Sequence, residues 1–307
     1  MRNRFIAISI ISMITIIAGG SFLHGSVPRD LIQKQKSFVR ELYLKERYFD
    51  CIAEARRTQC IISKTNNWHE YAYFIEGCYY LGKQYKSVIS HIGLDDESDD
   101  LRLPFLIMLS QSYLNIGLSS KGMDVLRQID YVEIGEDERY ELLLRRCEIL
   151  FRKSEYENAI FEIGIARNDI IGREDDIVKM KEDIEMYREI GERSKWLSVT
   201  LSSIFPGGGQ VYSGRLMDGM ISFISVLASA VGAYQFHKRG EDSLSITFGF
   251  LSLLLYAGNI YGAYNSAERM NMQRDSCFKL KLTKKYISPY NPMNYINIDS
   301  ILGISDK

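Results

Sequence analysis

Apolar residues recur at helical spacing through most of the chain between residues 30 and 192. The only proline in this stretch is Pro104, so little else in it would interrupt a helix. Three stretches carry no acidic or basic side chain: 5–23, 219–236 and 243–267. A helix needs about 20 apolar residues to cross a bilayer core, so the last two stretches predict membrane spans. The pattern predicts an all-α protein with a transmembrane helical hairpin near its carboxyl end.

The middle region contains an internal repeat. Its four copies are LYLKERYFDCI (42–52), YYLGKQYKSVI (79–89), YLNIGLSSKGM (113–123) and LFRKSEYENAI (150–160). Successive copies are 37, 34 and 37 residues apart when they are aligned on Tyr48, Tyr85, Ser119 and Tyr156. In each copy an apolar helix ends at a short polar turn and a second helix begins. One such hairpin cannot bury its own apolar face, so neighbouring hairpins are expected to stack.

This unit resembles the tetratricopeptide repeat, a helix hairpin of about 34 residues. The matching residues are Gly82 and Gly117 near the turn, Tyr48, Tyr85 and Tyr156 at the start of the second helix, and Ala159 and Gly122 where helices approach closely. The spacing varies, the third copy lacks the tyrosine, and the proline that usually closes a unit is missing. We predict a tetratricopeptide-like α-solenoid of about four hairpins over residues 27–192. The resemblance implies a groove for a protein partner; the alternative is a helical spacer that binds nothing.

The amino-terminal residues 1–26 combine a basic start, MRNR, with the apolar run FIAISIISMITII. This combination is typical of a secretory signal, and Ala18-Gly19-Gly20 supplies small residues for cleavage before Ser21. The alternative is an uncleaved anchor helix. Either role would place the following residues outside the cytoplasm.

The stretch IFPGGGQVYSG (204–214) has the glycine content of a phosphate-binding loop. Gly209 and Gly214 have the spacing of a Walker A loop, but Arg215 and Leu216 follow in place of lysine and a magnesium-binding hydroxyl. A dinucleotide fingerprint that starts at Gly207 would require a glycine at Tyr212. Nucleotide binding is therefore not expected, and we predict no cofactor.

The same stretch, followed by two apolar segments, resembles the two-transmembrane-helix domain family, found in bacterial and animal membrane proteins. The matching motif residues are Pro206, Gly207, Gly209, Gln210, Tyr212 and Gly214. The Asp-Arg-Phe motif often found between the two helices of that family is absent. The resemblance covers about residues 198–268 and implies a membrane location without an agreed activity. We assign residues 193–268 to a glycine-rich loop and a transmembrane hairpin.

Several contacts are expected within this region. Residues 204–214 are predicted to form a bend at the membrane interface or a short re-entrant turn, in which Gln210 and Tyr212 hydrogen-bond freed backbone groups. Asp218 either pairs with Arg215 or is simply solvated at the interface. Small residues should allow close helix packing, within the chain or in a homo-oligomer. These helix-packing residues are Ala228, Gly232, Gly258 and Gly262.

Residues 269–307 form a basic carboxyl-terminal tail, whose part FKLKLTKKY (278–286) suggests a short strand or a segment on anionic headgroups. A plain hairpin behind an exported repeat domain would leave two basic residues inside and nine outside, against the positive-inside rule. A third span over 196–214, or repeats on the cytoplasmic side, would restore the expected charge distribution. We predict a cytoplasmic (inner) membrane location with the repeats on the extracytoplasmic side.

The amino-acid composition argues against several classes of function. The formal net charge of −1 gives no basic field for nucleic acid. The four histidines are isolated, and the five cysteines are too sparse for a disulfide framework, although Cys78 could pair with Cys51 or Cys60. With no catalytic or metal constellation, we predict a non-enzymatic membrane-anchored scaffold that presents helical repeats beside a bacterial-type membrane. The alternative is an accessory subunit of a transporter or of an envelope-biogenesis complex, with the glycine-rich hairpin as its working element.

Overall fold

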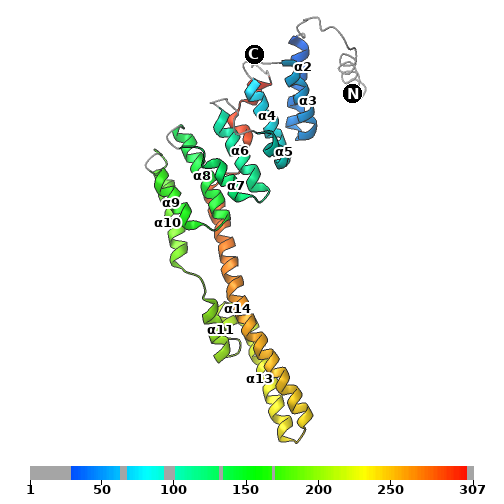
Figure 1. The fold of residues 1–307 in the computed structure, drawn as a ribbon, viewed down its shortest axis with the longest axis vertical. Coiled ribbons are helices and arrows are strands. Elements are labelled where there is room, and N and C mark those ends of the chain that lie inside the picture. Colours follow the sequence, from blue (N-terminus) through cyan, green and yellow to red (C-terminus); the bar gives the residue numbers. More distant parts are fainter. Residues whose placement is uncertain (1–28, 63–67, 93–100, 131–133, 168–169, 303–307) are drawn as a thin grey trace, which may run out of the picture. The chain divides into compact units, whose positions relative to one another are not determined.

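The computed structural model describes residues 29–62, 68–92, 101–130, 134–167 and 170–302 (Figure 1). These residues form helices and no strand, which confirms the predicted all-α class. The predicted signal or anchor, residues 1–26, lies outside the described residues. The chain divides into two compact units, one of residues 1–108 with 291–307, and the other of residues 109–290.

Four helix hairpins make up the predicted repeat region within the described residues. Their helices are α2 (Arg29–Leu44) and α3 (Tyr48–Ile62), α4 (Trp68–Leu81) and α5 (Tyr85–His91), α6 (Arg102–Asn115) and α7 (Ser119–Leu126), and α8 (Glu136–Arg152) and α9 (Tyr156–Ala166). The second helices begin at the four residues on which the sequence repeat was aligned. The hairpin prediction and its register are therefore confirmed.

The same backbone turn joins the two helices of every hairpin. In each turn one residue is left-handed, two positions before the second helix: Glu46, Lys83, Gly117 and Ser154, with φ between 55° and 83°. Its amide donates to the carbonyl three residues earlier, and the next amide donates to the carbonyl five residues earlier, as for Lys83 to Tyr80 and Gln84 to Tyr79. This pair of hydrogen bonds is the Schellman motif, which satisfies the last carbonyls of a helix.

Small residues allow the helices of the third and fourth hairpins to meet, as expected. A Cβ atom on Gly122 would lie 2.9 Å from the carbonyl oxygen of Ser110, and the Ser110 hydroxyl donates to the Gly122 carbonyl at 2.8 Å. Ala159 is fully buried. Larger side chains at these two positions would push neighbouring helices apart.

Helix α10 (Glu174–Glu189) follows the last hairpin. Its buried side chains are Ile177, Met180 and Ile184, whose spacing of three and four residues places them on one face of the helix. A short connection then leads to α11 (Lys195–Ile204), α12 (Gly208–Tyr212), α13 (Leu216–Lys238) and α14 (Asp242–Tyr286). Figure 1 shows α13 and the first part of α14 side by side, with α11 beside α14.

Two helices of the described residues, α13 and α14, are long and apolar enough to cross a membrane. Only 11% and 6% of their most apolar windows are buried, so they are not core helices of a soluble domain. The uncharged part of α13, residues 219–236, is about 27 Å long at 1.5 Å per residue, close to the thickness of a bilayer core. These observations indicate membrane association.

The predicted strand at 278–286 is wrong, because these residues form the last turns of α14. The alternative, a segment on anionic headgroups, stays a prediction. Phe278 and Leu282 are buried four residues apart, which is a helical spacing, and the intervening basic residues point elsewhere. Residue 269, where the predicted tail begins, lies within α14. Residues after α14 form η3 (Pro292–Tyr295) and α15 (Ile298–Ile301), and they belong to the first unit.

All five cysteines are free thiols. Cys51, Cys78 and Cys147 are buried, whereas Cys60 and Cys277 are exposed. The sulfur atoms of Cys51 and Cys78 are 3.8 Å apart, so of the two pairings considered from sequence only this one brings the residues together. Burial raises the pKa of the Cys78 thiol, which disfavours the reactive thiolate.

Candidate membrane-interface site

The glycine-rich stretch forms a tight turn between α11 and α12. Helix α11 ends at Ile204, and its capping residue Phe205 is extended. Phe205 precedes Pro206, and a proline disfavours the helical conformation of the residue before it. Gly207 then takes a left-handed conformation, with φ of 89°, and caps α12. Gly214, with φ of 79°, ends α12 through the same pair of hydrogen bonds that closes the repeat hairpins. Both motif glycines therefore meet a backbone requirement that other residues rarely satisfy.

Other glycines in this turn permit close contacts between helices. A Cβ atom on Gly207 would overlap the carbonyl oxygen of Gly219, at the start of α13. A Cβ atom on Gly209 would overlap the carbonyl oxygen of Ser198 in α11 and lie 2.6 Å from the Cβ of Ala263 in α14. Gly209 is therefore enclosed by α11 and α14, and its contacts are with backbone that cannot easily move.

A buried network of neutral polar side chains surrounds the turn. Gln210 donates from Nε2 to the backbone oxygen of Asn259 at 3.0 Å and to its Oδ1 at 3.2 Å. Asn259 Oδ1 also accepts from the Gly207 amide at 2.8 Å, and Asn259 Nδ2 donates to the Ser202 carbonyl at 3.1 Å. Ser202 Oγ accepts from the Gly209 amide at 2.9 Å and donates to Gln210 Oε1 at 3.0 Å. The side chains thus satisfy backbone groups that the turn removes from helical hydrogen bonding.

The segment from α11 to α12 begins and ends at the same level of α14. The Tyr212 hydroxyl accepts a hydrogen bond from the Ser194 amide at 3.2 Å, and Lys195 pairs with Glu268 at 2.7 Å. Between these ends, the Tyr256 hydroxyl of α14 donates to the Ser203 carbonyl. The chain therefore descends along α14 by about 12 residues, or roughly 18 Å, and returns. Residues 196–214 thus form two short helices joined by a turn, α11 and α12, and not one helix long enough to cross a bilayer. This backbone path has the form of the predicted bend or short re-entrant turn, whose position relative to a membrane stays a prediction.

Arg215 and Asp218 form an ion pair, 2.5 Å long, where α13 begins. Arg215 also lies 3.4 Å from the Ser266 hydroxyl of α14. A cleft of about 370 Å³ opens beside this pair, lined by both charged residues and by Gln210, Asn259 and Gly258. The pairing of Asp218 with Arg215 that the sequence suggested is thus present.

The four predicted helix-packing residues separate into two groups. A Cβ atom on Gly232 would lie 2.8 Å from Phe248, and one on Gly262 would lie 3.2 Å from Gln210 Nε2, so these glycines lie at contacts between helices. A Cβ atom on Gly258 would have no neighbour within 4 Å, and Ala228 is exposed. Ala228 and Gly258 therefore face outward from the hairpin.

The polar half of α14 joins the hairpin to the last helices of the repeat region. The Phe278 ring stacks on Tyr187 of α10 with centroids 3.8 Å apart, and it also contacts Tyr156 of α9. Asp275 accepts hydrogen bonds from the Tyr156 hydroxyl at 2.6 Å and the Ser154 hydroxyl at 2.9 Å. One continuous helix of 45 residues therefore carries both the apolar hairpin face and this docking contact.

Acidic residues at this junction favour their ionised forms. Burial opposes ionisation of Asp275, but hydrogen bonds from Tyr156, Lys279 and Ser154 outweigh it and lower the pKa of the carboxyl. Burial likewise opposes ionisation of Asp183 in α10, and hydrogen bonds from Lys285 and Tyr286 again produce a lowered pKa. Both contacts tie α14 to its neighbours through charge-assisted hydrogen bonds.

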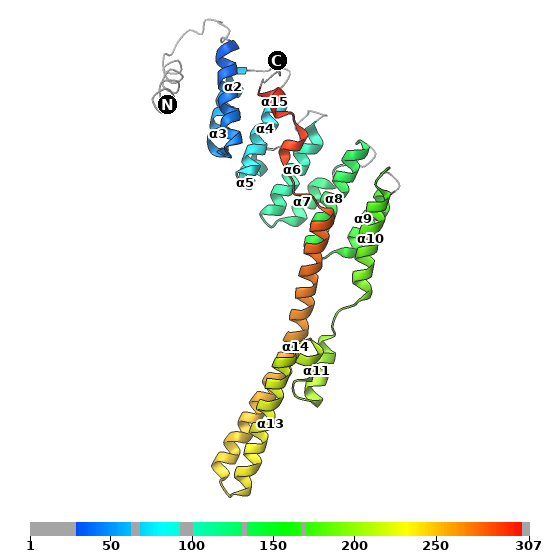
Figure 2. The same ribbon diagram turned by 180° about the vertical axis from the view of Figure 1, so that it is seen from behind.

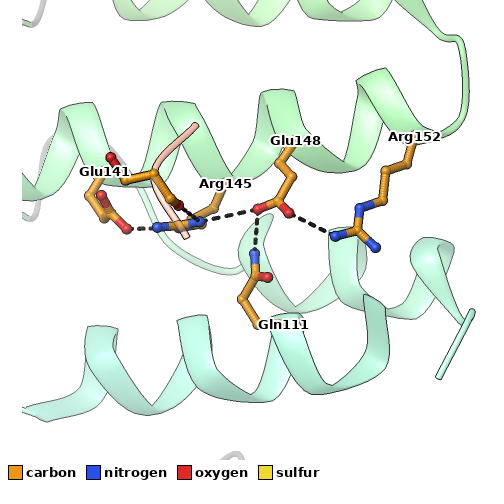
Figure 3. Close-up of polar contacts among 6 residues, drawn as sticks. Gln111, Glu141, Arg145, Glu148 and Arg152 are labelled. Atoms are coloured by element: carbon orange, nitrogen blue, oxygen red, sulfur yellow. Dashed lines mark hydrogen bonds and ion pairs between the residues drawn. The ribbon is translucent and has the colours of Figure 1, made fainter. Parts of the chain in front are cut away.

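The residues just after α14 are held by a buried arginine of α8 (Figure 3). Arg145 donates to Glu141 at 2.7 Å, to Glu148 at 3.2 Å and to the Ser288 carbonyl at 3.0 Å. Glu148 also accepts from Gln111 of α6 at 2.9 Å and from Arg152 at 3.0 Å. Because Arg145 has only 4% of its side chain exposed, both its charge and its donors require these partners.

The glycines, Gln210 and Tyr212 are recognisable from the sequence, but the residues that complete the polar network around the turn were not predicted. The missed residues are Ser198, Ser202 and Asn259. Ser198 and Ser202 are four residues apart, and therefore on one face of a helix, which is a detectable signal. The uncharged part of α14 contains two amide side chains, Asn259 and Asn265. A polar side chain within an apolar span commonly has a hydrogen-bonding partner.

The network contains hydroxyl and amide groups and no titratable side chain, so it can bind backbone but offers no acid, base or nucleophile of tuned pKa. Within the described part of the chain, no group of three or more histidine, cysteine, aspartate or glutamate side chains could hold a metal ion. The arrangement is therefore suited to holding a backbone turn.

Comparison with known proteins does not assign the chain to a family. No protein-family model matches it, and neither does any curated protein or solved structure. The resemblances to tetratricopeptide repeats and to the two-transmembrane-helix domain stay predictions based on the residues quoted above.

We expect Gly209→Ala to destabilise the full-length protein in detergent by about 1–3 kcal/mol or more, because the new methyl group would overlap fixed backbone. The matched control is Gly258→Ala, where nothing lies within 4 Å. Thermal unfolding followed by circular dichroism measures both. Equal melting temperatures for the two variants would contradict the enclosed position of Gly209.

We expect the Asp275 contact to depend on pH. Because its pKa is lowered from 3.8, its stabilising effect is complete at neutral pH and is lost as pH falls below about 4, through the lowered value. Asp275→Asn should reduce stability by roughly 1–2 kcal/mol at pH 7, and the difference from wild type should shrink towards pH 3. Thermal unfolding in detergent across this range measures the effect, with the exposed Glu182→Gln as control. A difference that stays constant down to pH 3 would contradict the assignment.

Proposed function

We propose that the chain is a non-enzymatic, membrane-anchored scaffold that presents helical hairpins to a protein partner beside a membrane. The observation that carries this proposal is the continuity of α14. Its first half pairs with α13 in an exposed apolar hairpin, and its second half docks on α9 and α10 through Phe278 and Asp275. A continuous helix of this kind would hold the last hairpin at a fixed distance and orientation from the membrane surface.

Exposed apolar side chains on the helical hairpins support a protein partner. Phe161 and Ile165 are exposed and four residues apart on α9, as are Met186 on α10 and Ile190, the residue that caps α10. Each pair forms an apolar stripe outside α13 and α14, the two helices that could cross a membrane. Such surface stripes commonly mark interaction sites.

We further propose that the repeats and the residues after α14 share one side of the membrane. The re-entrant path of α11 and α12 supports this, because it returns to the side from which it came. The amino-terminal signal favours the extracytoplasmic side for both. The excess of basic residues beyond the hairpin ends, nine against two in the connecting loop, favours the cytoplasmic side.

A second candidate function makes the hairpin the working element of a transporter or envelope-biogenesis complex. The cleft beside Arg215 and Asp218, which reaches the outward-facing Gly258, favours it. In that case a protein or lipid contact would concentrate on α13 and α14, rather than on the repeats.

Cysteine labelling would test the shared side. Single-cysteine versions of the full-length chain would keep only Cys60, only Cys277, or only a cysteine introduced as Arg239→Cys in the exposed loop between α13 and α14. A membrane-impermeant maleimide on intact and permeabilised cells should label Cys60 and Cys277 from one side and position 239 from the other. Labelling of Cys60 and Cys277 from opposite sides would contradict the proposed topology.

Photo-crosslinking in cells would test the scaffold role. A photoreactive amino acid at Phe161 or Met186 should yield a discrete, reproducible crosslink to another protein, because these side chains are exposed on the repeats. The matched positions on the hairpin are Ile246 and Leu253, which are exposed and apolar but expected to face lipid. Crosslinks from the hairpin positions alone would favour the second candidate, and no crosslink from either repeat position would count against a scaffold.

A further inference from the structure

The residues after Tyr290 bury apolar side chains against the first hairpins. Met293, Ile301 and Leu302 belong to the same apolar cluster as Val39 of α2 and Phe74 of α4. Ile301 and Leu302 are fully buried. In Figure 2 this carboxyl-terminal segment, drawn in red, lies beside α4. A segment distant in sequence therefore fills a surface that these helices would otherwise expose.

The contacts of this segment have the form of a bound peptide. It contains two short helical turns, and two basic residues of α2 make polar contacts with its far end. Lys36 donates to the Ile301 carbonyl at 2.7 Å, and Arg40 donates to Asp299 at 3.0 Å. A backbone carbonyl and one acidic side chain are thus recognised by fixed donors, while apolar side chains enter the cluster.

A glycine of α4 forms the niche for one of these side chains. A Cβ atom on Gly77 would lie 2.7 Å from Cε and 3.3 Å from Sδ of Met293. A glycine in a helix interior costs about 1 kcal/mol relative to alanine, and no turn or left-handed backbone requires it here. The space above Gly77 is therefore best explained by the side chain that fills it. Beside this niche, the Tyr295 ring meets the edge of Tyr73, with centroids 6.5 Å apart.

We propose that the face formed by α2 and α4 is a peptide-binding site, and that residues 291–302 are its resident ligand. The partner that this site accepts is a protein segment of the same chemistry. It carries a methionine or similar flexible apolar residue for the Gly77 niche, an aromatic residue two positions later, an acid four positions after that, and an aliphatic pair at the end. The face of α2 and α4 would be a binding site of the proposed scaffold, and its biological role rests on that proposed function.

Release of the resident segment need not detach α14. Arg145 holds Ser288 and Tyr290 within the other unit, through the hydrogen bond to the Ser288 carbonyl and a guanidinium contact 5.3 Å from the Tyr290 ring centre. The segment that follows would remain covalently tethered to the same chain. A short tether gives an effective concentration on the order of 1 mM, so a free partner competes only when its affinity or local concentration is high.

The test uses the full-length protein in detergent and a fluorescent peptide of sequence NPMNYINIDSIL, residues 291–302. Met293→Asp should release the resident segment, because an aspartate cannot occupy a position that is only 5% exposed. We expect the peptide to bind this variant at least about 10-fold more tightly than wild type, by fluorescence anisotropy. Adding Gly77→Leu should abolish that binding, whereas adding Gly164→Leu, in a helix position with nothing within 4 Å, should not.

Two results would overturn the proposal. The Met293→Asp variant could lose the helical signal of the first hairpins, which would make residues 291–302 an integral part of the fold. It could also stay folded and fail to bind the peptide. Hydrogen exchange in the wild-type protein provides an independent measurement. The amides of Asn294, Ile301 and Leu302, which are hydrogen-bonded within the segment, should exchange at least about 10-fold faster than those of α4. Equal rates would contradict a separately releasable segment.

This test is independent of the scaffold proposal. Peptide binding to the Met293→Asp variant requires no cellular partner. If the peptide binds and no repeat position crosslinks in cells, the site exists and the scaffold function fails. If crosslinks form and the peptide does not bind, the scaffold stands and its partner uses another surface, such as the apolar stripes of α9 and α10.

Discussion

The hydrogen bonds of Asn259 are the contacts on which the carboxyl-terminal half of the structure depends. A turn that is buried among helices removes amides and carbonyls from helical hydrogen bonding, and these groups need partners within the protein. Asn259 accepts from the Gly207 amide and from Gln210, and donates to the Ser202 carbonyl, so one side chain joins both arms of the turn to α14. With the turn closed in this way, the chain returns to its starting level, and α13 and α14 form a plain hairpin.

That path determines what the rest of α14 can contact. Because α11 and α12 run along α14 and back, the polar half of α14 lies where α10 ends. Phe278 and Asp275 can then meet Tyr187 and Tyr156. The neutral network at the turn and the charged contacts at the junction thus both involve α14. Its first half packs against the turn, and its second half packs against α9 and α10.

The sequence predicts those features that depend on nearby residues. The four hairpins follow from apolar periodicity and from turns whose hydrogen bonds span at most five residues, so the helix starts at Tyr48 and Tyr156 are evident from the sequence. The turn at Pro206 and Gly207 is likewise predictable from residues that restrict or free the backbone. The role of Asn259 is not, because its partner Gln210 lies 49 residues away and neither residue identifies the other. Residues 278–286 alternate apolar and basic side chains, and only their packing against α10 selects the helical alternative.

The order in which the chain is made adds a constraint on the first hairpins. The hydrogen bond between Lys36 and Ile301 joins residues 265 positions apart. Helices α2 and α4 are therefore synthesised long before the segment that covers them, while contacts so distant in sequence form slowly. Until residues 291–302 have been synthesised, the apolar face of α2 and α4 stays uncovered. During that interval the nascent chain is expected to need protection from aggregation. A chaperone could cover this face, and so could a partner of the proposed kind. After synthesis the same partner would have to displace residues 291–302.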